Sequence, residues 1–154
     1  MESWMTNKRA VSLVCLFVLQ VVVLQSCCSE AGHLGKGRKI VVGGEEEHWH
    51  FGFNYSAWAL KAGPFHVGDT LVFVYNTSTF NGITVNHNVY LLHSWKAYQQ
   101  CSFTKSIMLA NTTQGVPGFE YALMQRKMPR YFACSIGEGI HCNEGLMKFS
   151  IRPL

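Results

Sequence analysis

The segment from Thr70 to Tyr75 is the feature that most constrains the fold, because it is apolar on both faces of a β-strand. In an extended chain, Leu71 and Phe73 face one side while Val72 and Val74 face the other. Such a strand has to be covered on both faces, as it is inside a β-sandwich. Hydrophobic residues are 48% of the chain and charged residues only 14%, which is enough apolar material for a real core.

Other short apolar runs recur between turn residues, at the spacing typical of an all-β sandwich. We expect seven to eight strands, at residues 39–42, 49–53, 70–75, 88–92, 106–109, 120–124, 130–134 and 146–151. Residues 94–100 lack strand alternation and predict one or two helical turns. Residues 45–47 indicate a solvated turn, and 76–82 and 135–145 indicate loops. The pattern predicts one all-β domain with a short helix.

The N-terminus has the regions of a secretory signal peptide. Lys8 and Arg9 supply positive charge and precede an apolar run at residues 11–24. Ser29 and Ala31 then supply the small residues of a cleavage site after Ala31. A membrane anchor is the alternative, but the run is shorter than the roughly 20 apolar residues that a transmembrane helix needs.

We therefore expect a signal peptide at residues 1–31, a flexible lead-in at 32–38 and a mature domain at 39–154. Cleavage after Ser26 or Cys28 is the alternative. The chain ends without the hydrophobic tail of a lipid-anchor signal, so we expect a secreted, extracellular protein without a GPI anchor or a transmembrane segment. Peripheral association with the plasma membrane is compatible with this prediction.

Three sequons fit an extracellular location and predict N-glycosylation at Asn54, Asn76 and Asn111. The net charge of +4 is spread along the chain, without a run of Lys and Arg between aromatic residues. This charge pattern does not favour nucleic-acid binding.

The cysteine count is odd in the predicted mature domain. Three of the six cysteines fall within the predicted leader: Cys15, Cys27 and Cys28. The remaining three are Cys101, Cys134 and Cys142. Because an oxidising compartment favours pairing, one thiol is left over. It could form an intermolecular bridge, be an accident of the sequence, or bind a metal.

A predicted loop near the C-terminus carries Cys134 and His141 and leads into Met147. A second imidazole, His87, lies upstream where a loop meets a predicted strand. Sulfur with imidazole suits copper, and two His and one Cys with a weak axial Met form the blue-copper electron-transfer site. A copper site of this kind needs Cys134 as a thiolate. Cys101 and Cys142 would then pair, whereas pairing of Cys134 with Cys142 would remove the site.

Other chemistries fit these residues less well. Structural zinc prefers four strong ligands, and Met is a poor one. Cys134 and His141 could form a nucleophile and its base, but no carboxylate or Asn partner is evident, so we do not expect an enzyme. His93 is the reserve ligand if His87 does not bind. The other histidines have no partner pattern: His33, His48, His50 and His66.

Taken together, these residues resemble the phytocyanins, the plant-specific cupredoxins. The resemblance runs from Lys39 to Leu154. It rests on Val42-Gly43-Gly44, Trp49, Trp58, the block from Phe65 to Tyr75, His87-Asn88-Val89, Tyr131-Phe132-Ala133-Cys134 and His141-Cys142-Asn143-Glu144-Gly145.

The resemblance implies a cupredoxin-like Greek-key β-sandwich with one type 1 copper ion near one end. It implies His87, Cys134, His141 and Met147 as ligands, with a disulfide between Cys101 and Cys142. A basic chain without an anchor tail is most similar to the plantacyanin group of basic blue proteins. That group is associated with the cell wall, so cell-wall glycans are a candidate partner. An unidentified redox partner and a monomeric state are also expected.

The loop departs from the family pattern in two places. Six residues separate Cys134 from His141, which is more than the family usually has. Five residues separate His141 from Met147, and the family's usual count falls on Leu146 instead. The alternative function is therefore a copper-free, early-nodulin-like module that binds or signals through the same sandwich.

Overall fold

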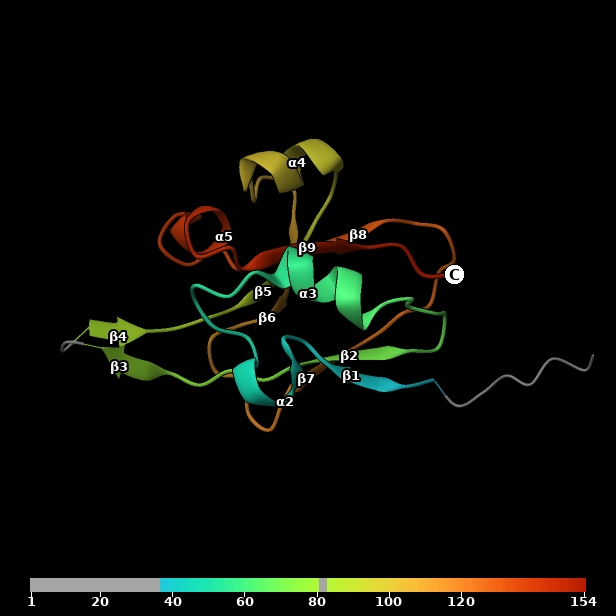
Figure 1. Ribbon diagram of the computed structural model, residues 1–154. Coiled ribbons are helices and arrows are strands. Elements are labelled where there is room, and N and C mark those ends of the chain that lie inside the picture. The colour runs from blue at the N-terminus through green and yellow to red at the C-terminus, as the bar shows by residue number, and fades with distance from the viewer. Residues whose placement is uncertain (1–36, 81–82) are drawn as a thin grey trace, which may run out of the picture. The chain divides into compact units, whose positions relative to one another are not determined.

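Two β-sheets face each other in the computed structural model, which describes residues 37–80 and 83–154 (Figure 1). The first sheet has the order β1 (Lys39–Val41), β2 (Thr70–Phe73), β7 (Phe119–Ala122). The second has the order β6 (Ile107–Ala110), β5 (Val89–Leu92), β8 (Arg130–Ala133), β9 (Lys148–Ile151). The predicted signal peptide and residues 32–36 of the predicted lead-in lie outside the described residues.

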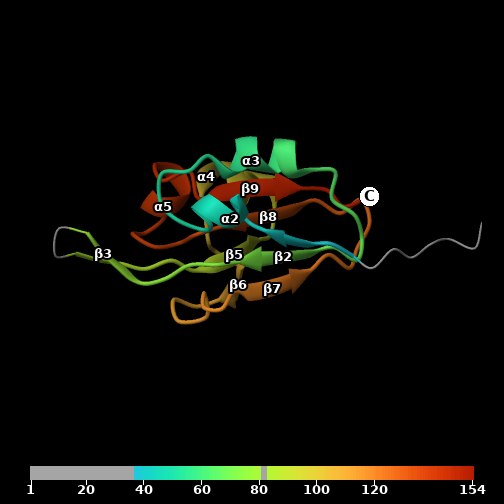
Figure 2. The same cartoon turned by 60° about the horizontal axis from the view of Figure 1, so that its bottom comes forward.

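Strand directions within the two sheets differ. β1 runs parallel to β2, with Ile40 opposite Leu71, whereas β2 and β7 are antiparallel. All neighbouring pairs in the second sheet are antiparallel. The hairpin of β3 (Ser78–Phe80) and β4 (Ile83–Val85) and the loop with α5 (Ile140–Asn143) lie at one end of the sandwich, and the C-terminus lies at the other (Figures 1 and 2).

Aromatic side chains from both sheets form the core. Phe73 of the first sheet packs against Phe132 and Phe149 of the second, with ring centroids 5.6 Å and 6.1 Å apart. Trp49 is buried beside Phe73. Its indole N–H donates to the carbonyl of Asn88 at 3.0 Å, so this buried polar group is satisfied. The pattern at residues 70–75 therefore correctly predicted a strand, and Leu71, Phe73 and Tyr75 are buried in the core. The expected cover on the other face is wrong, because Val72 and Val74 are only half-buried there.

Seven of the eight expected strands are present, but the one predicted at 49–53 is wrong. Trp49 anchors this segment in the core as a turn rather than as part of a sheet. The Tyr55 hydroxyl holds the turn, because it donates to the carbonyl of His48 and accepts the backbone N–H of His50. The loop predicted at 76–82 is also wrong, because this region contributes to the β3–β4 hairpin.

Short helices occupy several connections. α4 (Trp95–Gln100) confirms the predicted helical turns, and α2 (Gly44–Glu47) covers the predicted solvated turn. The sequence pattern did not predict α3 (Tyr55–Ala62), although Asn54 caps it by accepting the Ala57 N–H at 3.0 Å. Nor did it predict α5 within the 135–145 loop. No helix in the described part of the chain has both the length and the apolarity needed to cross a bilayer.

A buried carboxylate ties the start of β1 to the turn before β2. Asp69 accepts both the backbone N–H and the guanidinium of Arg38, at 2.9 and 2.8 Å, and the backbone N–H of His66 at 2.9 Å. Burial alone would raise the pKa of Asp69, but these hydrogen bonds lower it to about 2. The charged form is therefore favoured in the folded protein.

We predict that Asp69→Asn lowers the free energy of unfolding by about 2 kcal/mol at pH 7, because the favoured charge is lost. The pKa of Asp69 is lower in the folded protein than in the unfolded chain. Its charge therefore stabilises the folded state at pH values above the unfolded pKa, and this stabilisation is lost as the pH falls toward the folded pKa. Urea unfolding should therefore show a loss of stability between about pH 4 and pH 2 that the variant lacks.

Glu120→Gln is the control, because Glu120 pairs with Lys39 on the exposed surface. It should change stability by less than about 0.5 kcal/mol. Equal effects of the two substitutions would contradict the role given to Asp69.

Candidate metal centre

Three potential metal-binding side chains converge at the end of the sandwich near α5. His87 precedes β5, Cys134 follows β8, and His141 belongs to α5. The two Nδ1 atoms of His87 and His141 lie 3.2 Å apart, and the Cys134 sulfur lies 3.6 Å from Nδ1 of His141. One potential ligand atom from each residue lies within 4.8 Å of the other two. The predicted triad is thus brought together from three separate parts of the chain.

The protonation states of the two imidazoles in this cluster suit the binding of a soft metal ion. Burial, His141 and His50 lower the pKa of His87 to about 4, and burial also lowers the pKa of His141. Both imidazoles are therefore neutral at pH 7 and can offer a lone pair. Burial raises the pKa of the Cys134 thiol to about 11, although the backbone N–H groups of Asn88 and Ile136 act in the opposite direction. Without a metal, this thiol keeps its proton.

A disulfide anchors the helix that carries His141. Cys101 and Cys142 are bonded, with their Cα atoms 5.9 Å apart. Cys101 ends α4, and Cys142 follows His141 within α5. Cys134 is the free cysteine among the described residues, and it is buried. The bridge therefore holds α5 against α4 and leaves the third sulfur available.

The long connection from Cys134 to His141 is taken up by a turn and the start of a helix. Gly139 has φ +93° and stands at the N-cap of α5, a conformation that glycine adopts without steric cost. Its N–H donates to the carbonyl of Ser135 at 3.0 Å, which closes the turn. The extra residues thus coil at the surface while His141 stays near Cys134.

Met147 and Leu146 have opposite environments. Met147 is fully buried, whereas Leu146 is 42% exposed and has φ +55°. The backbone of Met147 is held on both sides, because its N–H donates to His141 and its carbonyl accepts the N–H of Cys134. Leu146 is therefore the more exposed of the two, and Met147 belongs to the same buried core as Cys134.

Asn88 joins the two segments that carry His87 and Cys134, a role that sequence analysis missed. Its side-chain carbonyl accepts the backbone N–H of Ser135 at 2.8 Å, and its amide donates to the Ser135 hydroxyl at 2.9 Å. Asn88 is buried. Its position directly after a candidate ligand was the available signal, but only the fold shows that it faces Ser135.

Phe51 is a second residue whose place was not predicted. Its ring meets that of His141 edge-on, with centroids 5.2 Å apart. The two segments are also joined by the N–H of Gly52, which donates to the carbonyl of Gly145 at 2.9 Å. A Cβ at Gly145 would lie 2.4 Å from the Phe51 ring, so glycine allows this close approach.

The other histidines that the structure describes do not join the cluster. His93, the reserve ligand, is exposed after β5. His50 pairs with Glu47 at 2.8 Å, and His66 lies near Asp69. His48 lies in the turn before Trp49, and His33 falls outside the described residues.

Comparison with known proteins identifies the fold and its class. The plastocyanin-like domain family model matches residues 49–146. Cucumber basic protein, a blue copper protein, is 27% identical, with a TM-score of 0.55 over 75% of this chain and 99% of that structure. Cucumber stellacyanin has a TM-score of 0.58 at 24% identity, covering 77% of this chain and 96% of its own, and supports the fold alone.

Two curated relatives come from Medicago truncatula. Blue copper protein 1b is 27% identical over 111 residues, which are 72% of this chain and 59% of the relative. Blue copper protein 1a is 24% identical over 142 residues, or 92% of this chain and 73% of that protein. The match therefore spans less than two thirds of the length of the first relative.

The matched family model and the sandwich define a plastocyanin-like, cupredoxin domain. Within that class, the chain belongs to the phytocyanin family. The resemblance seen in the sequence and the predicted fold class are both confirmed.

We predict that Asn88→Ala destabilises the protein by about 1–3 kcal/mol even without metal, because it removes the two hydrogen bonds of a buried side chain and leaves the half-buried N–H of Ser135 without its partner. Ser135→Ala should cost less, because the bond from its backbone N–H to Asn88 survives. Urea unfolding measures both.

Asn143→Ala is the control at an exposed Asn of α5, and it should change stability by less than about 0.5 kcal/mol. An Asn88→Ala variant as stable as this control would show that Asn88 does not join the two segments.

Proposed function

We propose that this protein is a secreted mononuclear blue-copper protein that carries single electrons. His87, Cys134 and His141 are its strong ligands. The observation that carries the proposal is the convergence of two neutral imidazoles and one unpaired thiol within 4.8 Å. This donor set fits type 1 copper, which accepts and releases one electron. Cys134 gives up its proton when it binds.

Met147 is the weak axial ligand in this proposal. The burial of the Met147 side chain supports this role, whereas the Leu146 side chain is exposed to solvent. The side chains around the cluster hold it in one geometry: Asn88 ties the His87 segment to the Cys134 segment, and the disulfide holds the His141 helix. A site held rigidly in this way suits electron transfer, because little has to move when the charge changes.

Electron transfer is favoured over catalysis. Cupredoxins are electron carriers rather than conventional enzymes, and His87 and Cys134 are both buried. His141 is the most exposed of the three and is the point nearest a redox partner, which we leave unidentified. The copper-free module remains the alternative, but it gives no reason for a buried free thiol to face two imidazoles.

The extracellular part of the proposal rests on the signal peptide pattern and the sequons. Asn54, Asn76 and Asn111 are all exposed. We propose that they carry N-glycans and that the mature protein is a monomer of the apoplast or cell wall.

We predict that copper(II) added to the mature domain binds at one ion per chain and gives an intense visible thiolate-to-copper absorption band. Cys134→Ser should abolish the band, because its sulfur is the donor of that transition. His93→Ala is the control, and it should leave the spectrum unchanged. Copper bound without such a band while Cys134 is a free thiol would defeat the proposal.

We predict that Met147→Leu raises the copper reduction potential, because an electron-rich axial donor is lost. Leu146→Ala should leave the potential nearly unchanged, because that side chain faces outward. Voltammetry of the two variants beside the original protein provides the comparison. A large shift in the Leu146 variant alone would assign the axial position to Leu146.

A further inference from the structure

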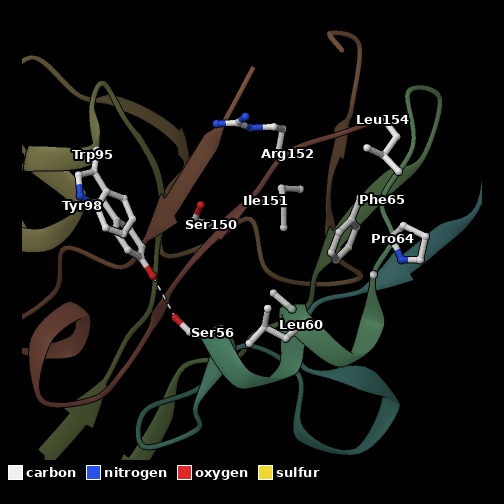
Figure 3. Close-up of a pocket in the computed structure, with 12 residues that line it drawn as sticks. Ser56, Leu60, Pro64, Phe65, Trp95, Tyr98, Ser150, Ile151, Arg152 and Leu154 are labelled. Carbon is white, nitrogen blue, oxygen red and sulfur yellow. Dashed lines mark hydrogen bonds between the residues drawn. The ribbon is translucent and has the colours of Figure 1, made fainter. Parts of the chain in front are cut away.

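A groove of about 610 Å³ lies beside β9 (Figure 3). β9 is the edge strand of the second sheet opposite β6, and no residue of the metal centre lines the groove. β9 forms its floor, and α3 and α4 supply residues to its two sides. The volume is in the range of small-molecule sites, which are mostly apolar with a few polar groups that orient the ligand. Neither the copper proposal nor the family match gives this groove a role.

One side of the groove is a rigid aromatic surface. Trp95 stacks on Tyr98, with ring centroids 5.2 Å apart and planes at 27°, and Trp95 is 52% exposed. Tyr98 is held in place, because its hydroxyl hydrogen-bonds with Ser56 at 3.0 Å (Figure 3) and its ring also packs against Tyr131. A planar ring that stacks on Trp95 would therefore meet a surface that is already ordered.

The opposite side is aliphatic and aromatic. Leu60, Pro64, Phe65 and Leu154 line it. Leu60 is strongly exposed, so a ligand here would remove apolar surface from water. Sugar hydroxyls would face side chains that cannot hydrogen-bond with them. This lining favours an apolar ring over a saccharide.

Arg152 gives the groove a positive charge. No acidic residue lines the groove, and no ion pair of Arg152 occurs among the residues that the structure describes. Figure 3 shows its guanidinium extending above Ser150 toward the side that holds Trp95. A guanidinium presents paired N–H donors that match a carboxylate, and Ser150 adds a hydroxyl.

We propose that this groove binds a small aromatic carboxylate. Its ring stacks on Trp95, and its carboxylate pairs with Arg152. The site lies on different residues from the metal cluster, so binding does not depend on copper.

The test is a chemical-shift titration of the full protein without copper, with 3-phenylpropanoate as the probe. The resonances of the Trp95 indole and of residues 150–154 should shift and saturate. 3-Phenylpropanamide keeps the ring and loses the charge, and it should bind at least about tenfold more weakly. Galacturonate keeps a carboxylate and loses the aromatic ring, and it should also bind at least about tenfold more weakly.

Variants separate the two contacts. Arg152→Gln should lower the affinity for 3-phenylpropanoate about tenfold and bring it close to the affinity for the amide. Arg126→Gln removes an exposed arginine elsewhere and should leave the affinity unchanged. Trp95→Leu should lower the affinity for both aromatic probes. Unchanged dispersion of the variant's other resonances will show that the variant is folded.

Equal binding of the acid and the amide would overturn the proposal, as would an Arg152→Gln variant that binds like the original protein. Galacturonate that binds as tightly as 3-phenylpropanoate would overturn it in favour of a saccharide site. None of these results bears on the copper proposal, which is tested by the absorption band and Cys134.

Discussion

The proposed site depends on how three sulfur atoms are divided. Cys142 lies one residue after His141, and its bond to Cys101 uses the sulfur that would otherwise compete for Cys134. If Cys134 were oxidised instead, no thiolate would face the two imidazoles. The same bridge draws α5 toward α4, so the pairing both spares Cys134 and positions His141. The pairing of the cysteines therefore determines both whether Cys134 is free and where His141 lies.

The surrounding fold serves that constraint by bringing distant segments together at one end of the sandwich. β5 and β8 are antiparallel, hydrogen-bonded neighbours, so His87 before β5 and Cys134 after β8 arrive at the same end of the sheet. Asn88 then links the two segments directly through Ser135. The lengthened loop alters only the path to His141, because its extra residues enter the turn and helix at 135–143. Extra residues within a strand would shift its register, but here they lie in a surface loop between Cys134 and His141.

The sequence predicted what depends on local pattern or on residue type. The apolar run at 70–75 indicated a core strand, and the loop with Cys134 and His141 indicated a metal site, because both signals come from residues that are close along the chain. The segment at 49–53 was misread, because alternating Trp49, Phe51 and Phe53 look like a strand until Trp49 is seen to enter the core. Similarly, Asn88 and Phe51 matter through Ser135 and His141, which are distant in sequence. Such contacts can be read only after the sheets have assembled.

The central claim is that Cys134, His87 and His141 bind one copper ion together, and X-ray absorption at the copper edge tests it most directly. For the copper-loaded protein, the account predicts one short copper–sulfur distance and two imidazole nitrogens in the first coordination shell, with the short sulfur lost in a Cys134→Ser sample. A shell made only of nitrogen and oxygen, in protein whose Cys134 is still reduced, would contradict it.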